Sequence, residues 1–188
     1  MCCLFGLIDY GRRLTGWQKG QMIRALAVES EIRGTDAAGI AYNSGGSLHI
    51  CKRPGPAHKL NLFIPEDAHV VMGHSRMTTQ GKAKYNRNNP PFTGNVPGTR
   101  FALAHNGVLY NDRTLRREKK LPKTNIETDS YVAVQLIEQQ GALTPASLKT
   151  MAEAVEGSFV FTVLDEEDSF WFVKGDNPLC LVQYPRLG

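Results

Sequence analysis

The chain has 188 residues, of which 41% are hydrophobic and 21% charged, with a formal net charge of +4. This composition is ordinary for a soluble globular protein, and the length indicates one domain over residues 1–188. No run of 18 apolar residues is present and the N-terminus lacks the charge order of a signal peptide, so we expect no membrane partner and a cytoplasmic location with reduced thiols.

The first half of the chain combines short apolar runs with one helical pattern. Apolar residues recur at close to helical spacing over 17–32 and Gly34 follows, which predicts a helix. The segment Asn43-Ser44-Gly45-Gly46 is typical of a hairpin turn. Strands are predicted over 2–8, 39–43, 48–52 and 68–74.

In the second half, residues 79–98 are polar and rich in Gly, Pro and Asn. They predict a long loop, and loops of that length in a compact domain tend to be functional. Helices are predicted over 128–140, which Gly141 closes, and over 143–155, with Pro145 in the first turn. Further strands are predicted over 100–105, 157–164, 169–174 and 179–183.

The strands come in antiparallel-looking clusters with helices grouped between them. Several strands are continuously apolar, which implies burial on both faces. Two sheets stacked face to face with helices outside would satisfy that pattern. The sequence therefore predicts an α+β fold of two mostly antiparallel sheets flanked by helices.

Several classes of site are disfavoured. The basic run over 116–120 has no interleaved aromatic residues and is typical of a helix end, where cations offset the negative pole, so we expect no nucleic-acid partner. The four cysteines form no CxxC pair and the five histidines have no metal-ligand spacing, so we expect no metal and no cofactor. The glycine-rich segment 33–40 lacks a Walker lysine and is not a phosphate loop.

Cys2 is the first residue with catalytic potential. Removal of Met1 would leave a thiol and a free α-amine on one residue. An α-amine has a pKa of about 7.7–8.0, so it can serve as the base for its own thiol. Taken alone, the position favours a structural cysteine in a buried N-terminal strand.

Three further positions have a functional and a structural interpretation. Arg76 follows an apolar strand, where it could bind a carboxylate or lie on the surface. Asn106 beside Gly107 offers two donors for an oxyanion, but Asn-Gly is also the commonest turn pair. Asp129 stands where a helix begins, where it could cap the helix or hold an ammonium group.

Taken together and in order, these segments resemble the class II glutamine amidotransferases, whose glutaminase domain is an N-terminal-nucleophile (Ntn) hydrolase. The resemblance runs from residue 2 to about residue 183. The matching segments are Cys2-Cys3-Leu4-Phe5-Gly6, Arg33-Gly-Thr-Asp-Ala-Ala-Gly-Ile40, Gly73-His-Ser-Arg76, His105-Asn106-Gly107 and Glu127-Thr128-Asp129.

The resemblance implies a four-layer αββα fold and a glutaminase mechanism. Cys2 would attack the side-chain amide of L-glutamine, its α-amine would shuttle the proton, and a γ-glutamyl thioester would release ammonia and then glutamate. Asn106 and the Gly107 N–H would bind the oxyanion. In the substrate pocket, Arg76 would bind the α-carboxylate, Asp129 the α-ammonium, and Thr79 would line the wall.

The resemblance also implies a separate synthase or acceptor subunit that receives the ammonia, and it leaves a homo-oligomer open. Cys3 replaces a glycine of the family, and Met77 replaces a tryptophan of members similar to glucosamine-6-phosphate synthase. The family domain usually continues a few tens of residues beyond the length of this chain. Two alternatives stay open: a non-catalytic binding or regulatory module of the same fold, and an Ntn hydrolase of another amide.

Overall fold

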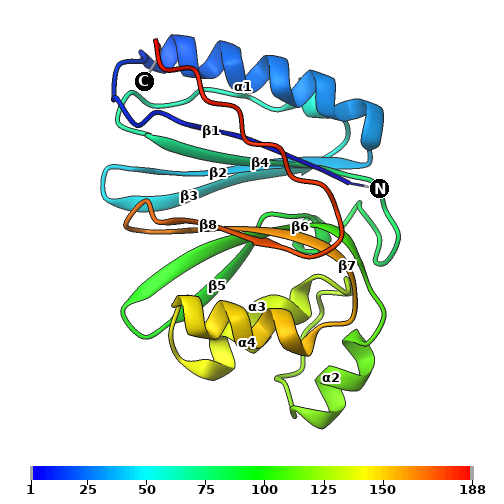
Figure 1. Cartoon of the computed structure of the whole chain (residues 1–188). Coiled ribbons are helices and arrows are strands. Elements are labelled where there is room, and N and C mark those ends of the chain that lie inside the picture. Colours follow the sequence, from blue (N-terminus) through cyan, green and yellow to red (C-terminus); the bar gives the residue numbers. More distant parts are fainter. Residues whose placement is uncertain (1, 187–188) are drawn as a thin grey trace.

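Two four-stranded antiparallel sheets lie face to face, with helices over both outer faces (Figure 1). The computed structural model describes residues 2–186. The first sheet has the order β1-β4-β2-β3, with β1 Cys3–Ile8, β2 Ala37–Ser44, β3 Ser47–Pro54 and β4 Val70–Arg76. The second has the order β5-β6-β7-β8, with β5 Phe92–Val96, β6 Thr99–Leu109, β7 Gly157–Asp165 and β8 Phe170–Lys174.

The helices begin and end at residues that favour those positions. The α-helices are α1 Gly16–Ser30, α2 Asp112–Glu118, α3 Tyr131–Gln140 and α4 Pro145–Ala154, and the short 3₁₀ helices are η1 Glu31–Arg33, η2 Ala57–Lys59 and η3 Asn86–Asn88. Thr15 and Thr144 form capping boxes at the starts of α1 and α4, and Gly141 ends α3 in the left-handed conformation. No helix within residues 2–186 is long and apolar enough to cross a membrane.

Three apolar clusters fill the spaces between the four layers. One packs α1 on the first sheet and includes Ile23, and another packs α3 and α4 on the second sheet. The third lies between the sheets and combines small side chains, such as Ala102 and Ala104, with larger ones, such as Met72. Phe101 and Leu103, which alternate with these alanines along β6, face the helices instead. The predicted four-layer αββα fold is confirmed.

Most predicted elements form, but three predictions are wrong. The predicted loop over 79–98 ends early, because residues 92–96 form β5 and pair with β6 through a turn at Pro97-Gly98. Strand β6 does not end at His105 but continues to Leu109, since β7 pairs with it throughout. The Asn106-Gly107 pair is therefore neither a turn nor a strand end.

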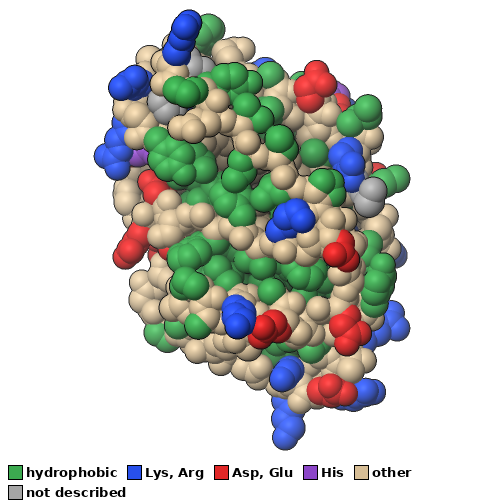
Figure 2. Space-filling view, in the orientation of Figure 1, with side chains coloured by type: hydrophobic (Ala, Val, Ile, Leu, Met, Phe, Trp, Pro, Cys, Tyr) green, Lys and Arg blue, Asp and Glu red, His purple; other side chains and the backbone are tan. Residues whose placement is uncertain are grey.

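The predicted strand over 179–183 does not form. After β8 the chain bends at residues 175–177 and crosses the edges of both sheets toward the start of α1, so it runs along neither edge strand (Figure 1). Leu181, Val182 and Tyr184 are exposed in this segment. Figure 2 shows apolar side chains gathered on the same face of the molecule. The apolar run over 179–183 therefore did not indicate whether the segment pairs within a sheet or crosses both sheets.

The strand register brings the sequence signatures to one end of the sandwich. Cys3 at the start of β1 is opposite Ser75 near the end of β4, and Ala37 at the start of β2 is opposite Arg76. Antiparallel neighbours therefore place Cys2 beside the end of β4. The second sheet supplies residues 105–109 of β6 at the same end.

At the other end of β1, Lys19 is a fully buried cation of α1. Its Nζ donates to the carbonyls of Glu66 at 2.6 Å and Ala68 at 2.9 Å, and lies 3.9 Å from Asp9 Oδ2. The Asp9 carboxylate in turn accepts from the backbone N–H groups of Arg13 and Leu14. This ion pair fixes the entry into α1 against the segment before β4.

Replacing Lys19 with methionine tests that role. We expect the free energy of unfolding in urea to fall by about 3 kcal/mol, because the change leaves a buried carboxylate without its cation and two carbonyls without a donor. Lys149→Met is the matched control, since the Lys149–Glu153 pair is exposed on both sides. Equal losses in the two variants would contradict a special role for Lys19.

Candidate functional site

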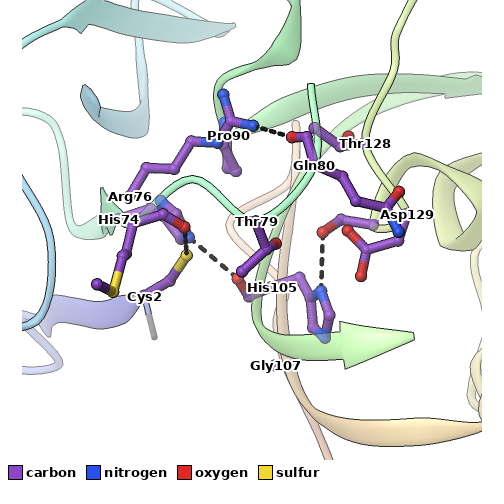
Figure 3. Close-up of a pocket in the computed structure, with 12 residues that line it drawn as sticks. Cys2, His74, Arg76, Thr79, Gln80, Pro90, His105, Gly107, Thr128 and Asp129 are labelled. Atoms are coloured by element: carbon purple, nitrogen blue, oxygen red, sulfur yellow. Dashed lines mark hydrogen bonds between the residues drawn. The ribbon is translucent and has the colours of Figure 1, made fainter. Parts of the chain in front are cut away.

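A small pocket lies between the start of β1, the end of β4 and the far half of β6 (Figure 3). It is lined by Cys2, His74, Arg76, Met77, Thr79, Gln80, Pro90, His105, Gly107, Thr128, Asp129 and Ser130. Five of the six site residues predicted from the sequence are in that set. The exception is Asn106, whose side-chain Oδ1 is buried and has no hydrogen-bond partner among the described residues.

Cys2 is held at the pocket by its backbone and its sulfur. Its carbonyl accepts from Arg33 Nε at 3.0 Å, and its Sγ donates to the Met77 carbonyl at 3.5 Å. Burial raises the pKa of the Cys2 thiol above its ordinary value. The thiol is therefore protonated at neutral pH, and a base must take its proton before or as the sulfur attacks an electrophile.

The segment 33–36 contacts both Cys2 and the end of β4. Gly34 lies so close to Arg76 that a Cβ would come within 2.4 Å of the Arg76 carbonyl carbon, so only glycine fits. Asp36 donates its N–H to the Arg76 carbonyl at 3.0 Å, and its Oδ2 accepts from the Thr78 N–H at 2.7 Å. The sequence marked this segment as a family signature, but it gave no sign of these contacts.

Arg76 is only 4% exposed and already has several partners. Its Nη1 donates to Asn89 Oδ1 at 2.6 Å, and its Nη2 donates to the carbonyls of Gly81, at 3.1 Å, and Gln80. The guanidinium thus binds both ends of the loop that runs from β4 to β5. An arginine has five N–H donors, so these three bonds leave two donors for other partners.

Two other contacts hold the same loop. Asn88 Nδ2 donates to Glu127 Oε2 at 2.8 Å, and Asn88 Oδ1 accepts from the Glu127 N–H at 3.0 Å. On the other side, Lys52 Nζ donates to the carbonyls of Asn89 and Pro91 at 2.7 and 2.9 Å. Burial lowers the pKa of Lys52 to about 8. Thr79, in the first part of the loop, is exposed at the mouth of the pocket.

Two buried histidines join the sheets beside the pocket. His74 Nε2 donates to the His105 carbonyl at 3.0 Å, which fixes its tautomer and leaves its Nδ1 without a proton. The His105 ring stacks on Phe161, with centroids 4.5 Å apart, and its Nδ1 lies 2.8 Å from Ser130 Oγ. Burial lowers the pKa of His74 to about 3 and that of His105 to about 4, so both rings are neutral at pH 7.

Gly107 lies in β6, and Asp129, just before α3, is hydrogen-bonded to the same stretch of that strand. Gly107 has a φ of 150°, and a Cβ there would lie 1.9 Å from the Ser158 carbonyl oxygen, so no side chain fits. Two residues further on, the Leu109 N–H donates to Asp129 Oδ2 at 2.8 Å. Burial raises the pKa of Asp129 above its ordinary value. The carboxylate is therefore fixed to the strand and faces the pocket.

Within residues 2–186, no group of three or more His, Cys, Asp or Glu side chains is arranged to hold a metal ion. The pocket instead gathers one thiol, one guanidinium and one carboxylate around a strand edge.

Comparisons with known proteins assign the family. The model of the glutamine amidotransferase domain matches residues 74–185, which is more than half of the chain. Glutamine–fructose-6-phosphate aminotransferase of Staphylococcus aureus strain Mu50 is 31% identical over 190 residues, covering 96% of this chain and 30% of that protein. The chain belongs to the class II glutamine amidotransferases. The corresponding Staphylococcus epidermidis protein is 30% identical over 188 residues, with 95% and 30% coverage.

Solved structures agree on the fold. The glutamine phosphoribosylpyrophosphate amidotransferase of B. subtilis, complexed with ADP and GMP, superposes with a TM-score of 0.65 at 22% identity, over 88% of this chain and 35% of that one. A structure described as the allosteric regulatory enzyme of purine biosynthesis gives 0.68 at 22% identity, over 88% and 36%. This amidotransferase chain thus spans about a third of the length of its relatives.

The neutral histidines predict acid sensitivity. Unfolded chains bind protons near the ordinary histidine pKa of 6.5, whereas His74 and His105 bind them only near 3 and 4. Their folded pKa values are depressed, so stability is complete above pH 6.5 and is lost as the pH falls below it. Each histidine contributes up to about 1.4 kcal/mol per pH unit to this loss.

Urea unfolding at pH 7, 6 and 5 measures the effect. We expect His74→Gln, which keeps a side-chain donor for the His105 carbonyl, to show a shallower decline in the free energy of unfolding than the wild type. His49→Gln, at an exposed position, should leave the decline unchanged. A decline of the same slope in His74→Gln as in the wild type would exclude His74 as a source.

Proposed function

We propose that this amidotransferase domain hydrolyses L-glutamine to glutamate and ammonia, with Cys2 as the nucleophile after removal of Met1. The observation that supports this most directly is that the thiol of Cys2, the guanidinium of Arg76 and the carboxylate of Asp129 line one pocket. A free α-amino acid has one carboxylate and one ammonium group to match that pair of charges.

The reaction has two stages in this proposal. The Cys2 sulfur attacks the side-chain amide carbon while its proton passes to the α-amine, and the resulting oxyanion is bound by the Gly107 N–H and the Asn106 side chain. The amine returns the proton to the nitrogen, the C–N bond breaks, and ammonia leaves a γ-glutamyl thioester. Water then attacks the thioester carbon through the same oxyanion, which releases glutamate and restores the thiol.

The pKa values of the site favour the α-amine as the base. The raised pKa of Cys2 requires a base, and the imidazoles that line the pocket are those of His74 and His105. With pKa values of about 3 and about 4, both imidazoles are too weak to accept a proton near pH 7. An α-amine with an ordinary pKa of about 8 suits the task, provided that Met1 no longer blocks it.

Substrate selection follows from the two charged groups. Arg76 would bind the α-carboxylate with the N–H donors that the loop leaves free, or by displacing one loop carbonyl. Asp129, held by the Leu109 N–H, would bind the α-ammonium, and Thr79 would contact the substrate from the loop. A peptide-bound glutamine lacks both charges and would be excluded.

We further propose that the ammonia goes to a synthase domain or subunit outside the 188 residues. The relatives named above are aminotransferases and amidotransferases about three times as long as this chain, so the acceptor reaction in them lies mostly outside the matched part. A homo-oligomer is compatible with this arrangement.

Labelling of Cys2 is the primary test. We expect 6-diazo-5-oxo-L-norleucine, an electrophilic analogue of glutamine, to modify Cys2 in protein whose intact mass shows the loss of Met1, and not in protein that retains it. Cys2→Ala should abolish ammonia release from glutamine. Cys51→Ala and Cys180→Ala change exposed thiols and should alter neither result. Absence of labelling in the Met1-free protein would refute the proposal and favour a non-catalytic module.

Substrate analogues test the charge pair. We expect Asp129→Asn to raise the KM for glutamine about 10- to 100-fold, since a charge-assisted hydrogen bond contributes about 1.5–3 kcal/mol. N-acetylglutamine has no ammonium group, so its poor turnover should change little in this variant. Arg76→Lys should likewise raise the KM for glutamine more than the KM for its α-amide derivative, which has no α-carboxylate.

Glu153→Gln, which alters an exposed carboxylate, serves as the control. If the Arg76 and Asp129 variants turned over glutamine as well as the wild type does, the site would suit hydrolysis of another amide better.

A further inference from the structure

The segment that follows β8 makes one direct contact with the pocket strand. Asn177, in the turn after β8, donates from its side-chain Nδ2 to the backbone carbonyl of Asn106 at 2.8 Å. The turn is fixed one step earlier, where the Gly175 N–H donates to the Phe159 carbonyl of β7 at 2.9 Å. Asn177 itself is half-buried, between the exposed residues Asp176 and Pro178.

The carbonyl that Asn177 binds is half of a functional peptide group. The Asn106 C=O and the Gly107 N–H belong to the same planar unit, so they point in opposite directions. Any group that fixes the carbonyl also fixes the direction of the N–H. A donor on the carbonyl also draws electron density from the N–H and makes it a stronger donor.

The strand pairing shows which way this unit points. Gly107 is opposite Phe159, whose carbonyl is directed to the β8 side by its bond with Gly175. In an antiparallel ladder, two residues opposite each other either both direct their backbone N–H and C=O groups toward the other strand or both direct them away from it. Since the Phe159 carbonyl is directed away from β6, the Gly107 N–H is directed away from β7, to the other edge of β6. Its neighbours agree, because the His105 carbonyl and the Leu109 N–H both have partners on that edge. That edge lines the pocket.

The same register makes Asn106 and Val160 a hydrogen-bonded pair, so β7 already orients the Asn106 carbonyl and Asn177 is a second donor to it. We propose that Asn177 is a positioning residue for the oxyanion site: it polarises the Asn106–Gly107 peptide, and so strengthens the Gly107 N–H toward the oxyanion. This inference rests on the proposed glutaminase function. Asn177 touches neither the substrate nor the reacting atoms in this scheme. A segment that belongs to no sheet thus takes part in the chemistry of the pocket.

Steady-state kinetics test the catalytic part of the proposal. We expect Asn177→Leu and Asn177→Asp, neither of which has an amide donor, to lower kcat for glutamine about tenfold, less than the 10²–10³ typical of removing an oxyanion donor outright. KM should stay within about twofold, because oxyanion binding is a property of the transition state. The affinity for L-glutamate γ-semialdehyde, which forms a tetrahedral adduct with a thiol, should fall by the same factor as kcat. Asp176→Asn is the matched control and should leave all three values unchanged.

The amide resonance of Gly107 provides a test that does not depend on activity. In glycine-labelled protein, its proton should move upfield in both Asn177 variants, because the N–H is less polarised, and should stay in place in Asp176→Asn. The remaining amide spectrum shows whether each variant is folded.

The two measurements separate the possible failures. If the wild type hydrolyses glutamine and both Asn177 variants keep its kcat and its Gly107 resonance, the inference is overturned and the glutaminase function stands. If the Met1-free wild type releases no ammonia, the proposed function fails, and with it the catalytic role of Asn177. The Gly107 shift would then still show whether Asn177 polarises the peptide. A fall in kcat with an unchanged Gly107 resonance would also overturn the proposal.

Discussion

The site depends on a stretch of strand edge that has lost its neighbour. Strand β5 pairs with β6 only as far as Leu103, so the backbone groups of residues 105–109 on that edge have no strand to bind. Buried backbone groups must be paired, and here side chains from elsewhere do it: His74 binds the His105 carbonyl and Asp129 binds the Leu109 N–H. Between them, the N–H of Gly107 is directed into the pocket. The strand edge is thus open between two side chains, and in the proposed mechanism this opening binds the oxyanion.

That arrangement explains why the neighbouring residues are buried and polar. His74 spans the gap between the sheets, from β4 to the His105 carbonyl of β6, and is 1% exposed. Burial lowers the pKa of its ring to about 3, so the ring is neutral at pH 7. As a consequence, the fold loses stability as the pH falls below 6.5. Gly107 in turn must be glycine, since the Ser158 carbonyl occupies the place of a side chain.

The sequence predicted the layers and the ordered signatures well, because both depend on local patterns. Continuous apolar strands implied sheets buried on both faces, and five short motifs pointed to one site. It failed where long-range pairing decides the outcome. Residues 92–96 are a strand because β6 offers an edge, and residues 179–183 are not, because the turn before them directs the chain across the sheets. The roles of all six predicted site residues remain predictions, although five of them line the pocket.

The sequence also did not predict the contacts that single residues make with partners far away in the chain. Arg33, Asn89 and Asn177 each meet the site through one hydrogen bond, and nothing in their local sequence marks those partners. Arg33 lies in a recognised motif, but the motif gives no hint that its Nε binds the Cys2 carbonyl.

These contacts share one physical form. The backbone carbonyls of Cys2, His105 and Asn106 each accept from a side chain of another element: Arg33, His74 and Asn177, respectively. A further strand paired with residues 105–109 of β6 would close the pocket. Side-chain donors on these carbonyls hold the backbone without a further strand, His74 on the pocket edge of β6 and Asn177 on the Asn106 carbonyl, which points the other way. Preorganisation of this kind lets a site bind charge in the transition state without first reorganising. It also accounts for the placement of the supporting residues on η1, β4 and the segment after β8, each of which reaches the edge from a different direction.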